Sequence, residues 1–246
     1  MKTNANGQDF PKWLLQLGSG FLQSSLDDLS EDAIDIPEAC MCNNSMVSNI
    51  FDNCTAEEMK NRVILFPKTS DCSAVNEEIL RRLPPETKTY LSTDSITSDN
   101  EEEAQNYPME FINSLTPSGM PPHHLNLKVG AIIMLLRNLS ITQALCNGTL
   151  LEVLQLHEHS IEASIISGSH SHTRELIPRI KLTPSNTNIP CILHRTQFLV
   201  CLSYSMTINK AQWQSFNRVG IHLPEPCFTR GQLYVAFSRA RAMNDG

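Results

Sequence analysis

Residues 207–215 combine side chains that could bind phosphate. Their sequence, Thr-Ile-Asn-Lys-Ala-Gln-Trp-Gln-Ser, supplies hydroxyl, ammonium and amide groups a few residues after the apolar run 198–202. If that run is a buried strand, these groups fall on a turn and on the first residues of a helix, where backbone N–H groups and the helix dipole favour phosphate. An ordinary solvated helix start explains the same spacing equally well.

Two arginines near the end of the chain are the second candidate. Arg239 and Arg241 follow the largely apolar segment 232–237, and on a helix they would point about 200° apart. One can face solvent while the other reaches across a cleft, and a guanidinium suits phosphoryl charge because its planar fork binds two oxygens. Taken alone, the spacing favours a simpler role as cations at a helix C-terminus.

Cysteines and histidines are the candidate metal ligands. Cys40 and Cys42 form a C-x-C pair, and H-x-H pairs at 157–159 and 170–172 would each share one face of a strand. No carboxylate or cysteine is spaced to complete either set, so scattered thiols and surface histidines are favoured and no metal site is predicted. The eight cysteines are expected to be reduced thiols in an intracellular compartment.

Composition excludes other classes of protein. The 246 residues are 41% hydrophobic and 18% charged, as in a soluble globular protein, and no run approaches the roughly 20 apolar residues of a membrane span. The start of the chain leads into no apolar segment of a secretory signal. The net charge of −7 divides into −12 for residues 1–120 and +5 for residues 121–246, so a polyanion is expected to meet the second half first.

The elements that would position these groups begin with an α/β pattern. A short helix is predicted at 10–17 and a buried strand at 63–66, closed by Pro67. An amphipathic helix capped by Ser70 or Asp71 follows that strand and ends before two prolines. A buried strand that feeds an amphipathic helix is typical of an α/β sheet.

The middle of the chain changes to short β-type segments. Strands are predicted at 129–136, 149–156, 161–166 and 175–182, with the turn dipeptide Asn147-Gly148 before one of them. This pattern predicts a small β-barrel inserted in an α/β domain.

The α/β pattern then returns. Strands are predicted at 198–202 and 218–223, and Thr229 with Gln232 forms a capping box that opens a helix through Phe237.

Five motifs occur along the chain in a fixed order. They are RVILFPKT at 62–69 with VNE at 75–77, LKVGA at 127–131 with MLLRN at 134–138, CNGT at 146–149, MTINKAQ at 206–212, and GQLYVAFSRAR at 231–241. Together they resemble the C-terminal half of Pif-type DNA helicases, a superfamily-one group that includes Helitron transposon helicases. The resemblance extends over nearly the whole chain, from about Phe10.

The resemblance implies a fold that agrees with the pattern of elements. It implies the second RecA-like domain of a helicase, interrupted by a small Src-homology-3-like β-barrel domain. The expected division is a first part of the RecA-like domain at 1–107, the inserted barrel at 108–183 and a second part of the RecA-like domain at 184–246.

The resemblance also implies an activity, ATP-dependent 5′-to-3′ DNA unwinding coupled to translocation on single-stranded DNA. Arg239 then serves as the catalytic finger on the ATP γ-phosphate, with Gln212 also at the nucleotide. Thr207, Lys210, Gln212 and Thr69 are the expected contacts with single-stranded DNA. On this basis, Arg239→Ala should abolish ATP hydrolysis in a full-length parent and leave DNA affinity within a few-fold.

ATP and Mg²⁺ are the implied cofactors, with sites mostly on the N-terminal half of the parent. The implied partners are single-stranded DNA and the N-terminal RecA-like domain of the same parent, with no membrane. In a eukaryote the resemblance implies a nuclear protein of DNA repair, recombination, telomere maintenance or Helitron transposition.

Several positions depart from the family pattern. Trp213 stands where the family has glycine, and Phe66 stands where a small residue is usual. Lys128 and Arg137 lie in the segments 127–131 and 134–138, which are the β-domain signature of the family. For these two residues a packing or surface role is at least as expected as a DNA contact. The chain contains no G-x-x-x-x-G-K-[ST] and no acidic Mg²⁺-binding partner for it, so it is not expected to hydrolyse ATP alone.

Two alternatives remain open from the sequence. The first is a non-catalytic single-stranded-DNA-binding module or a decayed transposon-derived remnant. The second is a zinc protein that uses Cys40, Cys42 and histidines.

Overall fold

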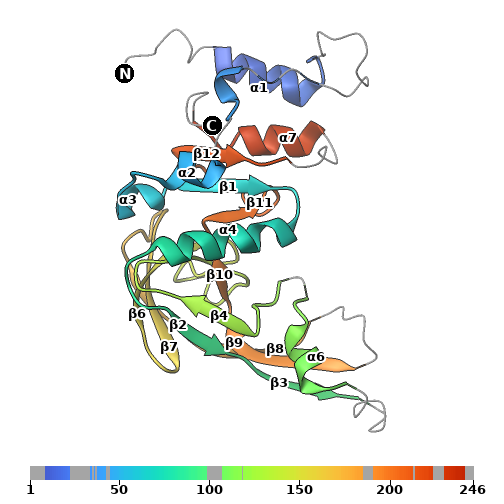
Figure 1. Ribbon diagram of the computed structural model, residues 1–246, viewed down its shortest axis with the longest axis vertical. Coiled ribbons are helices and arrows are strands. Elements are labelled where there is room, and N and C mark those ends of the chain that lie inside the picture. Colours follow the sequence, from blue (N-terminus) through green and yellow to red (C-terminus); the bar gives the residue numbers. More distant parts are fainter. Residues whose placement is uncertain are drawn as a thin grey trace. The chain divides into compact units, whose positions relative to one another are not determined.

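The computed structural model describes residues 9–22, 34, 36, 38–42, 45–98, 107–117, 119–184, 191–212, 214–223 and 230–241. The chain divides into two compact units (Figure 1). Met1–Ile79 and Tyr204–Gly246 form the first, called the sheet unit below, and Leu80–Ser203 form the second, called the barrel unit.

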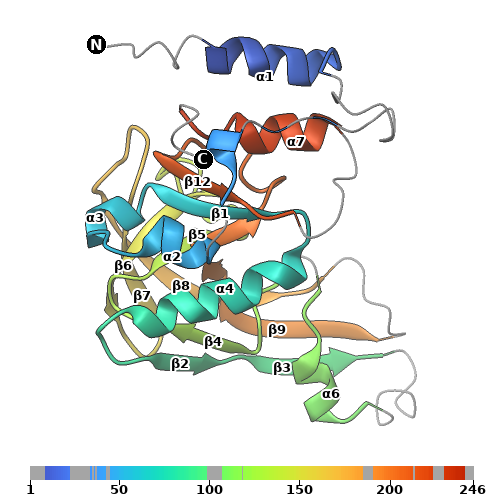
Figure 2. The ribbon, with the colours of Figure 1, turned by 45° about the horizontal axis from the view of Figure 1, so that its top comes forward.

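A three-stranded parallel sheet forms the centre of the sheet unit. The elements of this part of the chain are α1 (Asp9–Ser19), the 3-10 helix η2 (Glu38–Cys40), α2 (Met46–Phe51), α3 (Ala56–Met59), β1 (Arg62–Phe66), α4 (Thr69–Arg82), β11 (Ser205–Thr207), β12 (Arg218–Ile221) and α7 (Arg230–Phe237). The strand order is β11-β1-β12, and both pairings are parallel (Figure 2). Phe66 pairs with Thr207 and Leu65 with Ile221, so the three strands end at the same edge.

The first predicted elements of this unit are confirmed, with one correction. The apolar run at 63–66 is buried in β1, and the helix predicted at 10–17 is α1, which continues to Ser19. The cap prediction at Ser70 or Asp71 is wrong, because α4 begins at Thr69 and places both residues in its first turn. The Asp71 carboxylate there is still favourable for the helix dipole.

Helices α1 and α7 pack against each other (Figure 1). Leu17 of α1 is buried with Leu233 and Phe237 of α7, and the rings of Trp13 and Phe237 meet edge to face, 4.9 Å apart. The helix predicted through Phe237 is therefore confirmed, while its predicted Thr229 cap lies outside the described residues.

The barrel unit is built from antiparallel strands. Its elements are β2 (Lys88–Leu91), β3 (Thr93–Thr97), α6 (Met109–Ser114), β4 (His124–Leu127), β5 (Ile132–Leu135), β6 (Leu150–Leu156), β7 (Ser160–Ile165), β8 (Arg174–Leu182), β9 (Ile192–Phe198) and β10 (Val200–Leu202). Seven of the strands form one sheet in the order β10-β5-β6-β7-β8-β9-β3. The strands predicted at 149–156, 161–166 and 175–182 are confirmed within one residue as β6, β7 and β8.

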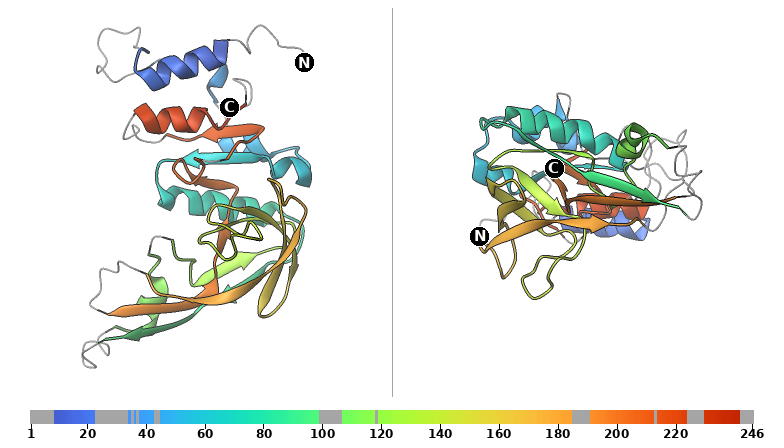
Figure 3. Two further views of the ribbon diagram at one scale, coloured as in Figure 1. Left: turned by 180° about the vertical axis from the view of Figure 1, so that it is seen from behind. Right: turned by 90° about the horizontal axis from the view of Figure 1, so that it is seen from below.

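Five strands of this sheet close into a ring. Only Leu199 separates β9 from β10, so the two act as one bent strand. Its first part pairs with β8 and its second part with β5, while β5, β6, β7 and β8 pair in sequence (Figure 3). This closure is the small β-barrel that the sequence predicts.

The strand expected at 198–202 differs from its prediction. It is present, but it pairs with β5 in the barrel unit instead of returning the chain to the parallel sheet. The strand expected at 129–136 is also shorter, because residues 129–130 form a turn in which Gly130 has φ +82°. The compact barrel unit is wider than 108–183, since β3, β9 and β10 belong to its sheet; the domain limits at 108 and 183 stay a prediction.

A buried ion pair joins β3 and β9 in the barrel unit. Arg195 is fully buried, and its Nε donates to Asp94 Oδ1 and Oδ2 at 2.9 and 3.0 Å. Its Nη1 donates to the carbonyls of Leu115 at 2.8 Å and Pro121 at 3.1 Å, and its Nη2 to that of Ile112 at 3.2 Å. The side chain therefore fastens the end of α6 to two strands that are distant in sequence.

The two basic residues of the β-domain signature lie in different surroundings. Lys128 is buried, and its Nζ donates to the carbonyl of Leu83 at 2.7 Å, just beyond the end of α4. Arg137 is exposed. The packing role considered for Lys128 therefore has a structural basis.

Candidate nucleic-acid interface

Polar side chains gather where the three parallel strands end. The Ile208 N–H donates to the Phe66 carbonyl at 2.9 Å, and the His222 N–H donates to the Leu65 carbonyl at 2.9 Å, so the chain leaves all three strands at one level. Exposed polar residues that follow these strands are Lys68, Thr69, Asn209, Lys210, Gln212 and His222, together called the carboxyl edge below. Ligands of parallel α/β sheets bind at such an edge.

The segment after β11 folds differently from its prediction. The Lys210 and Ala211 N–H groups donate to the Thr207 carbonyl at 2.9 and 3.3 Å, and the Gln212 N–H donates to the Asn209 carbonyl at 3.4 Å. These bonds make consecutive turns at 208–212, so the helix expected here is wrong for the described residues. The helix N-terminus at this edge belongs to α4, which begins at Thr69.

The structure brings the predicted DNA contacts to one edge with different exposures. Thr69, Lys210 and Gln212 are exposed, whereas Thr207 is the last residue of β11 and only 9% exposed. The exposed side chains can meet a ligand directly, whereas the Thr207 carbonyl accepts the N–H groups of Lys210 and Ala211 and so helps to form the turns. Trp213 lies outside the described residues.

Arg239 lies just after α7 and donates to the segment that follows the turns. Its partners are the carbonyls of Val235 at 3.0 Å, Ala211 at 3.2 Å, Gln214 at 2.9 Å and Gln212, and Ser238 Oγ at 2.9 Å. Burial lowers the pKa of the Arg239 guanidinium, and the nearby Tyr234 opposes that change. The group still remains protonated, as arginine does in proteins. Arg241 is exposed, and both arginines lie beyond α7, which ends at Phe237, so the helical spacing from which they were expected to point apart is not present.

The backbone strengthens the same connection. The Phe216 N–H donates to the Arg239 carbonyl at 3.0 Å, and Phe216 and Ala240 form an isolated parallel bridge. The end of α7 is therefore fixed to residues 211–216 through both side chain and main chain.

A buried clamp, which the sequence did not reveal, holds β11 against α4. Asn76 Nδ2 donates to the Ser205 carbonyl at 3.0 Å, and Asn76 Oδ1 accepts from the Ser205 N–H at 2.8 Å. Ser205 Oγ also donates to the Cys72 carbonyl at 2.8 Å. This clamp sets the position of the strand that leads to Lys210 relative to the helix that begins at Thr69. An asparagine among the apolar positions of a predicted helix was the only available signal.

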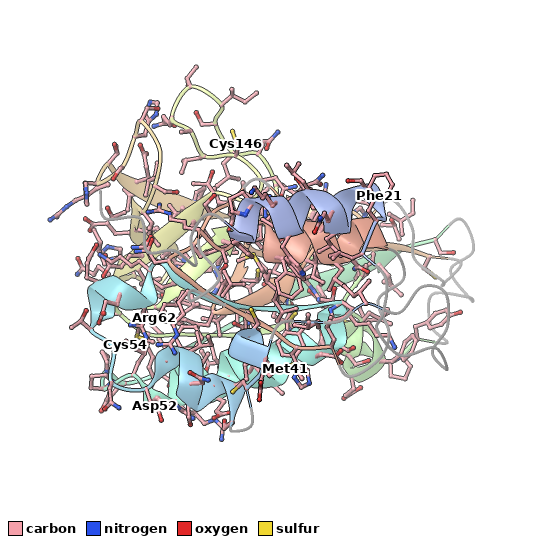
Figure 4. All side chains as sticks on the ribbon, turned by 90° about the horizontal axis from the view of Figure 1, so that it is seen from above. Phe21, Met41, Asp52, Cys54, Arg62 and Cys146 are labelled. Carbon is pink, nitrogen blue, oxygen red and sulfur yellow. The ribbon has the colours of Figure 1, made fainter. Side chains whose placement is uncertain are left out.

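At the amino end of β1, Arg62 is paired with groups of the same unit. Arg62 donates to the Ile50 carbonyl at 2.7 Å and to Glu58 Oε1 at 3.1 Å, beside Cys54 (Figure 4). Burial raises the pKa of the Cys54 thiol, and the Arg62 charge opposes that rise. The amino edge of the sheet is thus an internally paired cluster with a protonated thiol.

Within the described part of the chain, no group of three or more His, Cys, Asp or Glu side chains is placed to hold a metal ion. No helix among those residues has the length and apolar character to cross a membrane.

Comparisons with known proteins identify relatives of this arrangement. The family model described as "DNA helicase Pif1, 2B domain" matches residues 110–156. ATP-dependent DNA helicase PIF1 of Xenopus laevis is 30% identical over 173 residues, which cover 70% of this chain and 25% of the relative.

Solved structures share the fold. The crystal structure of Pif1 helicase from Candida albicans has a TM-score of 0.64 and 20% identity, covering 97% of this chain and 52% of the other. Pif1 helicase from Bacteroides in complex with ADP-AlF3 and ssDNA has a TM-score of 0.59 and 23% identity, covering 96% of this chain and 48% of the other.

The fold is α/β, a RecA-like domain combined with a small β domain, as the sequence predicts. The chain corresponds to the C-terminal part of Pif1-type helicases. It spans about a quarter of the length of the curated relative and about half of the solved chains.

Proposed function

We propose that this chain supplies the second RecA-like domain and the inserted β domain of an ATP-dependent DNA helicase, and that the carboxyl edge binds the backbone of single-stranded DNA. The observation that carries the proposal is the gathering of Thr69, Lys210 and Gln212, all exposed, at one edge of a parallel sheet. The Bacteroides Pif1 structure in complex with ADP-AlF3 and ssDNA supports the ligand class.

The carboxyl edge offers the groups that a phosphate backbone needs. Lys68 and Lys210 are exposed cations, and the first turn of α4 adds a helix N-terminus beside the Thr69 hydroxyl. Hydroxyl, ammonium and amide contacts to phosphate carry no sequence information. We therefore expect binding that depends on salt but little on base sequence.

The nucleotide side of the proposal involves Arg239 and Gln212. Arg239 would act as the finger on the γ-phosphate, and most of the ATP and Mg²⁺ contacts would come from the N-terminal RecA-like domain of the same parent. The charge of Arg239 supports its part in this division, because all of its partners among the described residues are neutral. No step through Mg²⁺ is assigned to this chain.

The finer predictions follow from the resemblance alone. Unwinding in the 5′-to-3′ direction, the domain limits at 108 and 183, nuclear location and roles in repair, recombination, telomere maintenance or Helitron transposition stay predictions.

Fluorescence anisotropy with the 246-residue chain and a labelled oligo-dT tests the DNA site. Titrations at several NaCl concentrations give the slope of log K against log salt. Lys210→Ala should weaken binding and reduce the slope by about 0.7, the value for one lost phosphate contact on a single strand.

Lys60→Ala is the matched control. It removes the same charge just before β1, where Lys60 pairs with Glu57, and should leave the slope unchanged. If the folded chain shows no saturable binding, or if Lys210→Ala keeps the wild-type slope, the proposed DNA site is wrong. Binding that is saturable yet indifferent to ATP also fits the chain as a binding module when separated from its parent.

A further inference from the structure

Arg239 is bound to the chain through all three of its nitrogens. Nε donates to one carbonyl, Nη2 to the Ser238 hydroxyl, and the two Nη1 hydrogens are shared among three carbonyls. Those three carbonyls belong to Ala211, Gln212 and Gln214, which lie 25 to 28 residues before the arginine. The side chain therefore closes a long loop through its charge and not through apolar packing.

We propose that Arg239 is a positioning residue for the single-stranded-DNA site, because its guanidinium holds the carbonyls of Ala211, Gln212 and Gln214 and so fixes the turns that present Lys210 and Gln212. This inference rests on the proposed function of the carboxyl edge. It assigns Arg239 a role at the DNA site in addition to the expected one at the nucleotide.

Electrostatics explains why the turns need this cation. Three carbonyl oxygens that converge on one point place the negative ends of three dipoles together, which is unfavourable without a donor between them. The turns at 208–212 are held by short-range backbone bonds of 2.9 to 3.4 Å and by the burial of Ile208 and Ala211, and the guanidinium adds a restraint on the carbonyls of Ala211, Gln212 and Gln214. Without the guanidinium, the carbonyls would turn toward water, and the Lys210 side chain would lose its fixed position.

The same geometry links the two proposed roles of Arg239. Four of the five N–H groups already have partners among the described residues, so a phosphate that binds two adjacent N–H groups of the guanidinium must displace at least one of these partners. Phosphate binding at the guanidinium would then change the free energy of the turns that present Lys210. By reciprocity, DNA binding at those turns would change the affinity of the guanidinium for phosphate by the same factor. On this inference Arg239→Ala also weakens DNA binding, whereas the family resemblance alone implies a DNA affinity within a few-fold of wild type.

A double-mutant cycle on the 246-residue chain tests the inference, with the oligo-dT anisotropy titration as readout. Arg239→Ala should weaken binding by about tenfold, the scale of a lost charged hydrogen-bonding group. Arg239→Lys should recover part of that loss because it keeps a cationic donor. Arg241→Ala removes the same charge from an exposed position two residues later and should change affinity less than twofold.

The double variant Arg239→Ala/Lys210→Ala separates positioning from general destabilisation. If Arg239 acts through the turns that present Lys210, the double variant should bind only slightly more weakly than Arg239→Ala alone. Fully additive losses, or an unchanged affinity of a cooperatively folded Arg239→Ala chain, would overturn the inference while the Lys210→Ala result still supports the DNA site.

If Arg239→Ala does not fold, Arg239→Lys and Arg239→Gln take its place, and wild-type affinity in both would overturn the inference. Loss of all binding by the wild-type chain would instead contradict the proposed function.

Discussion

Arg195 in the barrel unit and Arg239 in the sheet unit both direct several N–H groups at backbone carbonyls, yet their surroundings differ in one respect. Arg195 is fully buried and forms an ion pair with the equally buried Asp94. The described partners of Arg239 are all neutral, and its side chain is only partly buried.

The counter-ion decides what each arginine can do. The charge of a buried guanidinium is neutralised by an adjacent carboxylate, so the pair does not attract a further anion. A guanidinium that faces only carbonyls keeps its net positive charge and can still attract an anion. Arg195 therefore has a structural role, whereas Arg239 can still bind a phosphate.

The largest expected effect comes from breaking the Arg195–Asp94 pair. Asp94→Ala should lower the free energy of unfolding by about 3–5 kcal/mol, since it leaves a buried charge without its partner. Urea denaturation measures this loss. Arg174→Ala is the control, because that arginine forms an exposed pair with Glu162 at 3.5 Å and should cost below about 1 kcal/mol. Equal losses in the two variants would remove the distinction drawn for Arg195.

A buried neutral clamp should cost less to break than the buried ion pair. Asn76→Ala leaves the Ser205 N–H and carbonyl without their side-chain partner, which should lower the free energy of unfolding by about 1–3 kcal/mol. Ser73→Ala, at an exposed position of the same helix, should change it by less than about 0.5 kcal/mol. If Asn76→Ala is as stable as Ser73→Ala, the clamp does not hold β11.

The sequence predicted elements that have a local apolar pattern. β1 is a short apolar run, β6 and β7 largely alternate buried and less buried residues, and α1 and α7 carry the apolar residues through which they pack. β9 was missed because its residues His194 to Gln197 are polar, although Arg195 and Gln197 are fully buried. Their burial depends on partners about 75 to 107 residues away, which no local pattern reveals.

The candidate site shows the same limit. Family motifs marked the residues Thr69, Lys210 and Gln212 before the strand register brought them to one edge. The helix expected after Thr207 does not form in the described residues, and the carbonyls of Ala211, Gln212 and Gln214 are held instead by an arginine far along the chain. A contact of that range cannot be derived from the local sequence.

The smallest expected effect concerns a loop of the barrel unit. Ala144 has φ +56°, a left-handed conformation that is costly for a residue with a Cβ. Ala144→Gly should raise the free energy of unfolding by about 0.5–1 kcal/mol, after the greater entropy of glycine in the unfolded chain is deducted. Ala163→Gly, in the buried strand β7, should lower it. If Ala144→Gly instead lowers the free energy of unfolding, the left-handed backbone at this position does not destabilise the loop. Contacts of the alanine side chain would then stabilise the barrel unit there.

Hydrogen exchange of the 246-residue chain with and without oligo-dT tests the central claim most directly, because it locates the bound strand. Amide exchange is expected to slow in residues 67–71 and 207–212 on addition of DNA, and to stay unchanged at the amino edge in residues 56–62. Unchanged exchange at both carboxyl-edge segments under saturating DNA would contradict the assignment of the DNA site to this edge.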